Sequence, residues 1–319
     1  MLPYLARRLL AAIPTLLLIS FVVFAILALA PGDPLSQFAA NPEVPPEVRE
    51  QIRHSLGLDQ PWPIRYVKWL TAVVQGDWGY SFASRIPVWD LIEQRIPATL
   101  AVLGVAYVVS ILLAIPIGVI SGVKRYSLFD HAATTLAFIG FSVPTFFTGL
   151  VLIILFSVKL GWLPFIYDST IRVDDWDSFI AQVKQSIMPI AVLALFQTAT
   201  LVRYTRASVL ENLPLDWVRT AHAKGLNQAS VMVRHVLRNS LIPVVTLIAL
   251  SAPTVFSGAI ITEQIFRVPG IGSLLIASIN SSDTPVVMAI TFTFAALIVL
   301  FNIVADVLYG VLDPRIRYD

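Results

Sequence analysis

Long, uninterrupted runs of apolar residues constrain the fold of this chain more than any other feature of its sequence. A helix needs about 20 apolar residues to cross the roughly 30 Å hydrocarbon core of a lipid bilayer. Six segments are long enough, and they cover residues 10–30, 98–122, 132–158, 186–206, 239–261 and 286–310. Because these runs are continuous and do not alternate between apolar and polar residues, they favour helices over barrel strands. We therefore predict an all-α integral membrane protein with six transmembrane helices.

The composition agrees with a membrane protein and excludes several other classes. Hydrophobic residues make up 57% and charged residues 13% of the 319 residues, whereas soluble domains carry about 25% charged residues. The chain has no cysteine, so disulfides, thiolate metal sites and cysteine nucleophiles are excluded. A formal net charge of +2 without a dense Lys/Arg block indicates that nucleic acid is not a partner.

The first apolar run follows Arg7 and Arg8, so it has the basic start of a secretory signal peptide. It is too long for a signal peptide, and it ends in Ala30-Pro31-Gly32-Asp33 without a small-x-small cleavage site. We expect it to be retained as the first transmembrane helix.

Lysine and arginine residues predict the orientation of the six spans. If the N-terminus is cytoplasmic, the four inner segments hold 12 Lys/Arg in 63 residues and the three outer segments hold 10 in 118 residues. Cytoplasmic loops carry the excess of basic residues in membrane proteins, so both termini are expected in the cytoplasm. The inner segments are residues 1–9, 123–131, 203–238 and 311–319, and the outer ones are 31–97, 159–185 and 262–285.

This topology divides the chain into three parts. Residues 1–30 form the N-terminal cytoplasmic end and the first helix, and residues 31–97 form a long extracytoplasmic loop or cap. Residues 98–319 form a core of five transmembrane helices with a cytoplasmic loop at 207–238. The 31–97 loop is rich in aromatic residues, which are typical of an interfacial belt; the alternative is a docking surface for an outside partner. These aromatic residues are Trp62, Tyr66, Trp69, Trp78, Tyr80 and Trp89.

The motifs of nucleotide and hydrolytic chemistry are missing or incomplete. Gly140-Phe141-Ser142-Val143-Pro144 lies in an apolar helical run without the strand that a nucleophile elbow requires, so a proline kink is the better interpretation. Gly270-Ile271-Gly272 lacks the third glycine of a dinucleotide site, and the sequence has no P-loop. The four histidines are too scattered for a metal site. We predict no catalytic, cofactor or metal site, and the residues of a translocation pathway are not identified.

One carboxylate, Asp306, lies inside a predicted span, with Asn302 one turn before it. An ionisable residue inside a membrane helix is a candidate for a role in transport. The alternative is an ion pair with a neighbouring helix. The sequence leaves both interpretations open.

The polar segment from Pro214 to Arg238 is the main cytoplasmic feature, and it is predicted to form two short helices separated by Gly225. Arg219, His222 and Lys224 give the first helix a basic edge. Taken alone, this pattern also fits an amphipathic helix that lies on anionic membrane lipid.

The segment Arg219-Thr220-Ala221-His222-Ala223-Lys224-Gly225-Leu226, followed by Arg234-His235-Val236-Leu237-Arg238-Asn239, resembles the EAA loop of ABC-importer permeases. Its R-T-A-x-A-K-G-L form is similar to that of the dipeptide/oligopeptide/nickel permease family. Further segments resemble this family in the same order along the chain. They are Tyr4–Leu10, Pro31–Pro34, Gly57–Pro61, Gly76–Ser81, Gly161–Pro164, Glu263–Phe266, Pro269–Gly272 and Leu312–Arg317.

The resemblance implies half of a type I importer, which assembles from two homologous permease subunits, two ATP-binding subunits and an extracytoplasmic solute-binding protein. ATP and Mg²⁺ would bind to the partner ATPases and not to this chain. The short EAA helix would fit a groove on the ATPase. Its matching residues are Asp216, Arg219, Thr220, Ala221, Ala223, Lys224 and Gly225, together with His222, which stands where arginine is common. Arg219 replaces the leading glutamate of the general pattern, and Arg238 replaces its loop proline.

The resemblance therefore predicts a permease subunit of the inner (plasma) membrane that is not itself an enzyme. Peptides are the expected substrate, and nickel chelates, sugars or opines are alternatives within the same architecture. Two alternatives from other classes are an ion-coupled secondary carrier, which would need intramembrane charges and inverted repeats, and an intramembrane enzyme. The sequence shows neither those features nor a paired nucleophile and base.

Overall fold

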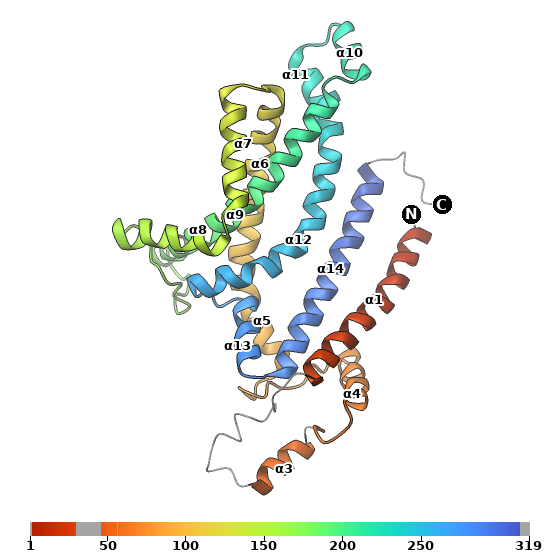
Figure 1. Cartoon of the computed structure of the whole chain (residues 1–319), viewed down its shortest axis with the longest axis vertical. Coiled ribbons are helices and arrows are strands. Elements are labelled where there is room, and N and C mark those ends of the chain that lie inside the picture. The colour runs from red at the N-terminus through yellow and green to blue at the C-terminus, as the bar shows by residue number, and fades with distance from the viewer. Residues whose placement is uncertain (1, 30–45, 56, 313–319) are drawn as a thin grey trace.

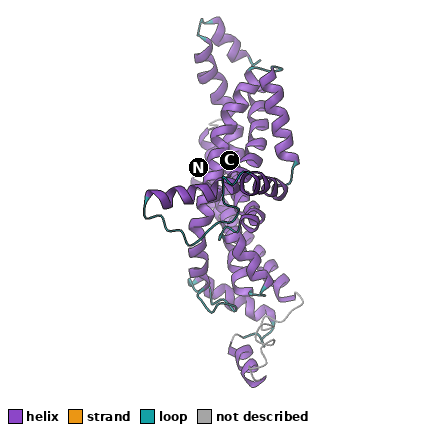
Figure 2. Cartoon of the chain, turned by 90° about the vertical axis from the view of Figure 1, so that its left-hand side faces the viewer, coloured by secondary structure: helices purple, strands orange, loops and turns teal. Residues whose placement is uncertain are grey.

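The computed structural model describes residues 2–29, 46–55 and 57–312. Most of these residues are helical, and the longer loops between helices cover residues 75–87 and 160–175 (Figure 2). Within the described ranges, pairing of extended backbone is limited to an isolated bridge between Tyr80 and Pro87. The predicted all-α fold is confirmed. The family-like segments Pro31–Pro34 and, beyond Leu312, residues 313–317 lie outside the described residues.

The helices follow one another with short π-helical segments, labelled η1–η3, continuing several of them. Their bounds are α1 Leu2–Leu29, α3 Pro46–Ser55, α4 Trp62–Val74, α5 Val88–Thr99, η1 Leu100–Gly104, α6 Val105–Val123, α7 Leu128–Ser142, α8 Thr145–Leu152, η2 Ile153–Lys159, α9 Trp176–Asn212, α10 Asp216–Ala223, α11 Gln228–Val231, η3 Met232–Leu237, α12 Arg238–Phe266, α13 Ile271–Asn280 and α14 Thr284–Leu312.

Five of the described helical stretches are long and apolar enough to cross a membrane, and up to seven spans result if each of two bent helix pairs is counted as one. The five are Ala6–Leu29, Val88–Val123, Trp176–Asn212, Gln228–Pro253 and Thr284–Leu308. One bent pair, α7 with α8 and η2, covers the predicted span 132–158. The predicted six spans lie within this range of five to seven, and the span 132–158 is bent.

The bend in the α7–α8 pair measures 103° and lies at the proline that the sequence predicts as a kink. Val143 is extended, with φ −85° and ψ 124°, and Pro144 directly precedes α8. A residue before proline is disfavoured in the helical conformation, so α7 ends at Ser142. The kink interpretation is confirmed, and α8 leaves the bundle almost at a right angle to α7 (Figure 1).

Several helix bounds differ from the predicted spans. The helix predicted at 98–122 begins at Val88, inside the predicted outer loop 31–97, and the one predicted at 186–206 runs from Trp176 to Asn212. Asp175 explains the early start of α9 because its side chain accepts a hydrogen bond of 2.8 Å from the Ser178 N–H and forms a capping box. The predicted outer loop 262–285 contains α13, which is bent by 87° from the end of α12. Hydropathy alone did not detect α13 because its ten residues are too few to cross a membrane.

Helices α6 and α9 pack closely against each other through glycines. A Cβ atom at Gly118 would lie 2.6 Å from the Thr205 Cβ, and one at Gly122 would lie 2.8 Å from the Val209 Cγ1. Small residues at such spacing let two membrane helices approach each other. A third contact continues the interface, because Ala114 is fully buried in a cluster with Leu201 and Val202. The α6–α9 pair is therefore the rigid centre of the fold.

The intramembrane carboxylate Asp306 forms an ion pair with Arg8. The Arg8 Nε lies 3.1 Å from the Asp306 Oδ2, and a second nitrogen of the same guanidinium donates a hydrogen bond of 3.2 Å to Oδ1. This pair joins α1 to α14, which lie side by side (Figure 1). Of the two interpretations of Asp306, the structure supports the ion pair with a neighbouring helix.

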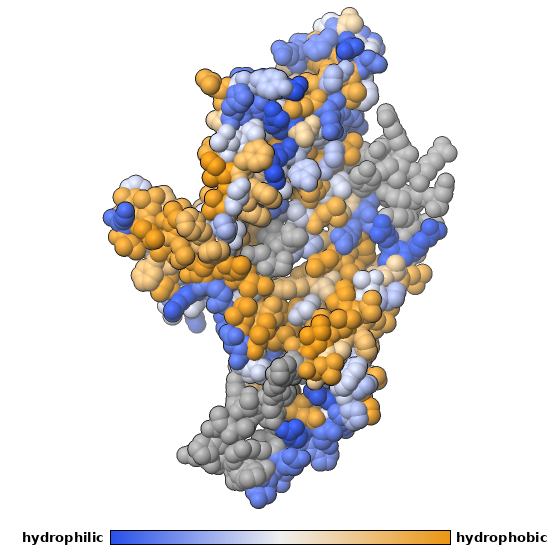
Figure 3. Space-filling view, viewed as in Figure 1, coloured by the Kyte–Doolittle hydropathy of each residue, from blue (hydrophilic) through white to orange (hydrophobic). Residues whose placement is uncertain are grey.

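The two ends of the molecule are polar and its middle is apolar. Helices α10 and α11 lie at one end, and α3 and α4 lie at the opposite end (Figure 1). Hydrophobic residues gather over the middle of the molecule, between hydrophilic ends, as Figure 3 shows. This distribution fits a protein whose middle third lies in the bilayer.

Candidate functional site

The predicted cytoplasmic loop 207–238 begins inside a helix, because α9 extends to Asn212. The chain then turns at Pro214 and forms α10, a turn at Lys224 and Gly225, α11 and η3 before it continues into α12. The first predicted short helix is confirmed as α10. The second is not a separate short helix, because the helix that begins after Gly225 continues without a break through α11 and η3 into α12. Helices α10 and α11 form the outermost part of this end of the molecule (Figure 1).

Gly225 makes the turn between the two helices. Its φ is +75°, a left-handed value that disfavours residues with a Cβ atom. Its N–H donates a hydrogen bond of 2.9 Å to the His222 carbonyl, and the Leu226 N–H donates one of 3.4 Å to the Ala221 carbonyl. The Asn227 side chain then accepts a hydrogen bond of 2.8 Å from the Ser230 N–H and begins α11. The sequence therefore fixes the direction of the chain on both sides of Gly225.

One side of α10 is buried against the rest of the protein. Val218 and Ala221 are 4% and 3% exposed and pack in one cluster with Val209 of α9, Val231 and Val236. Residues three apart on a helix share a face, so these two residues define the inward side. This cluster joins α10 to the end of α9, which Gly122 brings close to α6.

The other side of α10 is polar and exposed. Ala221 is the one buried residue among the eight predicted to contact an ATPase. Thr220 donates a hydrogen bond of 2.8 Å to the Asp216 carbonyl, and Arg219 lies 3.9 Å from the Asp216 carboxylate. The exposed residues are Asp216, Arg219, Thr220, His222, Ala223, Lys224 and Gly225. They form one accessible surface on α10 and its following turn.

Helices α9 and α12 are joined directly below this surface. The Ser208 hydroxyl donates to the Ser240 carbonyl at 2.8 Å, and the Ser240 hydroxyl donates to the Ser208 carbonyl at 3.3 Å. Both side chains are buried. A displacement of α10 would therefore be passed to two long helices.

A buried ion pair between α7 and α9 lies near the same end of the molecule, and the sequence analysis did not identify it. Arg206 donates two hydrogen bonds, of 2.6 and 2.8 Å, to the two carboxylate oxygens of Asp130, which is 1% exposed. Asp130 also accepts hydrogen bonds from the Ser121 hydroxyl and, at 2.9 Å, from the Tyr126 N–H. The one signal in the sequence was Ser127 three residues before Asp130, which is typical of a helix start. The pair fixes α6, α7 and α9 relative to one another.

Glu263 is a second buried carboxylate, at the bend between α12 and α13, where the sequence predicted an outer loop. It is 1% exposed and accepts a hydrogen bond of 2.8 Å from the Ser273 N–H and one of 3.2 Å from the Thr99 hydroxyl. A Cβ atom at Gly270 would overlap its carboxylate. Thr99 also accepts a hydrogen bond of 2.8 Å from the Ile271 N–H. Glu263 therefore holds the bend between α12 and α13 against α5.

The described residues contain no group of three or more His, Asp or Glu side chains that could hold a metal ion. Apolar helices long enough to cross a membrane, with the exposed polar helix α10 at one end of the molecule, define the class as a multi-pass membrane protein.

Comparison with known families agrees with this class. The model of the binding-protein-dependent transport system inner membrane component matches residues 114–318. A second model, the N-terminal part of such membrane components, matches residues 1–103. The chain belongs to this family and is a multi-pass membrane permease component rather than a catalytic subunit, as the sequence predicts.

Individual relatives match over the full length of the chain. It is 40% identical over 316 residues to the oligopeptide transport system permease protein AppB of Bacillus subtilis, covering 99% of each chain. It is 40% identical over 337 residues to the dipeptide transport system permease protein DppB of Escherichia coli, covering 100% of this chain and 99% of the relative. It is 39% identical over 318 residues to the glutathione transport system permease protein GsiC of Escherichia coli, covering 100% of both. The resemblance to dipeptide and oligopeptide permeases is confirmed.

Proposed function

We propose that this chain is the permease half of an ATP-driven peptide importer and that α10 is its contact with a separate ATPase subunit. The two-sided structure of α10 carries the proposal. Val218 and Ala221 are buried against the bundle, while Arg219, His222 and Lys224 are exposed. A helix fixed on one side and polar on the other suits the transfer of motion from a soluble partner to membrane helices.

In this proposal a second, homologous permease subunit completes the translocation pathway, and two ATP-binding subunits hold ATP and Mg²⁺. Closure of the ATPases brings α10 of this chain and its counterpart in the second permease together, and this shifts the permeases between inward-open and outward-open states. Both termini and α10 face the cytoplasm, and the 31–97 segment faces the solute-binding protein. The higher Lys/Arg density of the predicted inner segments supports this orientation.

The lipid-surface interpretation of α10 is less well supported. A helix on lipid turns its apolar side toward the bilayer. In α10 the apolar residues Val218 and Ala221 are already buried by α9, α11 and η3. Trp217, which is 42% exposed, is the one large apolar side chain on the accessible side. The surface is therefore better suited to a protein groove than to lipid.

Peptides are the proposed substrate because the relatives described above are named for oligopeptide, dipeptide and glutathione transport. Glutathione is itself a modified tripeptide, so all three names share a peptide chemistry. None of them refers to nickel chelates, sugars or opines. The ion-coupled carrier is less well supported, because Asp306, the one carboxylate inside a predicted span, forms an ion pair with Arg8.

The test is reconstitution of the chain with its partner permease, the two ATPases and the solute-binding protein in liposomes. We expect ATP hydrolysis to rise when the binding protein is loaded with di- or tripeptides. Loading with a nickel chelate or a sugar should leave it at the basal rate. Stimulation by a non-peptide ligand alone would contradict the substrate, and uptake by this chain without ATPases, driven by an ion gradient, would contradict the class.

A further inference from the structure

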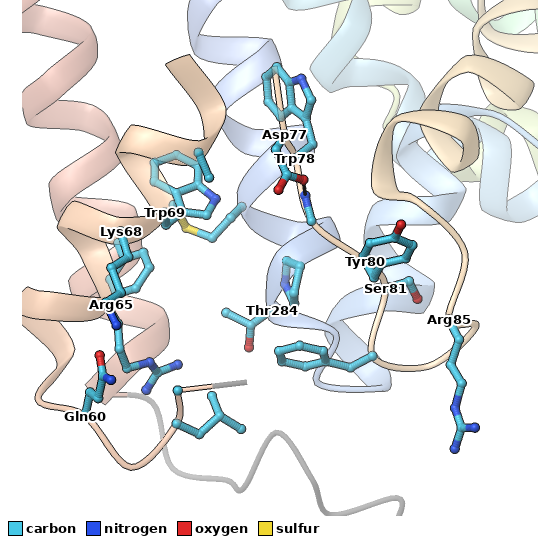
Figure 4. A pocket seen from close by; sticks show the side chains of 18 residues that line it. Gln60, Arg65, Lys68, Trp69, Asp77, Trp78, Tyr80, Ser81, Arg85 and Thr284 are labelled. Carbon is cyan, nitrogen blue, oxygen red and sulfur yellow. Dashed lines mark hydrogen bonds between the residues drawn. The ribbon is translucent and has the colours of Figure 1, made fainter. Parts of the chain in front are cut away.

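A cavity of about 720 Å³ lies between α4, the loop at residues 75–87 and the start of α14, at the end of the molecule opposite α10 (Figures 1 and 4). Its volume is in the range of sites that bind small molecules. Phe24 of α1 and Met288 of α14 contribute to its apolar wall. None of the residues that line the cavity belongs to the proposed ATPase contact on α10.

The walls of this cavity are fixed by contacts on each side. On one side, Tyr66 of α4 packs edge-on against Phe24, with ring centroids 5.5 Å apart, and its hydroxyl lies 3.0 Å from the Ser20 hydroxyl. On the other side, the carboxylate of Asp283 accepts hydrogen bonds from the Ser81 hydroxyl and, at 2.9 Å, from the Phe82 N–H. The cavity is therefore formed by a rigid frame and is not a gap between loosely placed loops.

Two buried polar atoms of the lining residues have no hydrogen-bond partner among the described residues. They are the Trp69 Nε1, a donor, and the Gln60 Oε1, an acceptor. Buried polar groups in proteins are almost always paired, so each exception calls for an explanation. Both atoms are closed to solvent in this structure, so a ligand with one acceptor and one donor would pair them once the side chains that cover them shift.

The charged residues of the cavity are separated. Arg65 and Lys68 lie on one face of α4, and neither forms an ion pair with another described residue. Arg65 is half-buried, its guanidinium carbon lies 6.0 Å from the centroid of the Phe24 ring, and burial lowers the pKa of this guanidinium below its ordinary value. Asp77 lies away from Gln60 and Arg65, beside Trp78 (Figure 4). The cavity thus offers cations at one end and a carboxylate at another.

We propose that this cavity binds short zwitterionic peptides. The peptide carboxylate would pair with Arg65 and Lys68, and the peptide ammonium would face Asp77. A peptide bond supplies the missing partners, because its carbonyl accepts from the Trp69 Nε1–H and its N–H donates to the Gln60 Oε1. This inference rests on the proposed function, since peptide import would bring such molecules to the predicted extracytoplasmic end of the permease.

The experiment measures equilibrium binding of radiolabelled Ala-Phe to the complete importer in phosphatidylcholine nanodiscs without the binding protein. We expect saturable binding that Arg65→Gln weakens by about tenfold or more, since a hydrogen bond to a charged group is lost. Trp69→Phe keeps the ring and removes only the N–H, so we expect a loss of about fivefold. The matched controls, Arg172→Gln and Trp176→Phe, alter exposed residues outside the cavity and should not change the affinity.

Modified peptides and a second lipid complete the test. N-acetyl-Ala-Phe-amide lacks both charges and should bind at least about tenfold more weakly. Unchanged affinity in Arg65→Gln and Trp69→Phe, or absence of saturable binding in the wild type, would overturn the proposal. Loss of Ala-Phe binding in phosphatidylethanolamine nanodiscs would also overturn it, because a lipid headgroup with a primary ammonium, which phosphatidylcholine lacks, would then be the occupant. If peptides still stimulate ATP hydrolysis but do not bind in the cavity, the cavity proposal fails and the proposed import function stands. If peptides bind in the cavity but do not stimulate ATP hydrolysis, the proposed import of peptides fails and the cavity proposal stands.

Discussion

Substitution of Gly225 tests whether the turn after α10 is needed for contact with the ATPase. The φ of Gly225 is +75°, and nothing lies within 4 Å of the position that a Cβ atom would occupy. A larger side chain therefore meets no neighbour, and its effect comes from the backbone alone. A left-handed conformation costs a residue with a Cβ atom about 1–2 kcal/mol, and such a cost changes a population by about 5–30-fold.

The affinity for the ATPase subunit should fall least in Gly225→Asn, more in Gly225→Ala and most in Gly225→Val. Asparagine tolerates φ > 0, whereas a β-branched residue does not. The affinity of the purified permease for its ATPase subunit should fall by about 5–30-fold in Gly225→Val. Gly161→Val is the matched control, since Gly161 has φ +65° and also has nothing within 4 Å, but lies outside the 207–238 loop. Equal affinities in all three Gly225 variants, or the same loss in Gly161→Val, would refute the reasoning.

Three further predictions concern the packing that supports the site, each measured as the free energy of unfolding of the purified subunit in mixed micelles. Asp130→Asn and Arg206→Gln should each lower the free energy of unfolding by about 2–4 kcal/mol. The double variant should lower it by at least about 1 kcal/mol less than the sum of the two single losses. Additive losses would contradict a coupled pair. Gly118→Ala should cost about 1–3 kcal/mol because its Cβ would overlap Thr205, whereas Gly104→Ala, with open space, should cost nothing. Glu263→Ala should cost about 1–3 kcal/mol for each donor left unpaired, and Glu263→Gln should recover part of that loss; equal losses would indicate that the carboxylate is not the acceptor.

The sequence predicts the spans well because a membrane helix needs a certain length and apolar residues, and both are local properties of one segment. The run 132–158 illustrates the limit of this reasoning. Its proline predicts a break, but the 103° angle depends on what α8 packs against. Such packing joins segments that lie far apart in the sequence.

Two buried carboxylates, Glu263 and Asp130, show the same limit at the level of single residues. Hydropathy assigns Glu263 and Asp130 to loops because each lies beside the end of an apolar run. Their burial depends on Thr99 and Arg206, which are 164 and 76 residues away. The position of the α10 site, in contrast, follows from a local motif, and its inward side follows from the spacing of Val218 and Ala221.

Site-directed cross-linking tests the central claim most directly, because the chain has no cysteine of its own. A photoactivatable cross-linker attached to His222→Cys in the assembled importer should link this chain to the ATPase subunit. The same reagent at Thr170→Cys, an exposed residue outside the 207–238 loop, should not. The account would be contradicted if the position at 222 gave no link to the ATPase or if the position at 170 gave the stronger one.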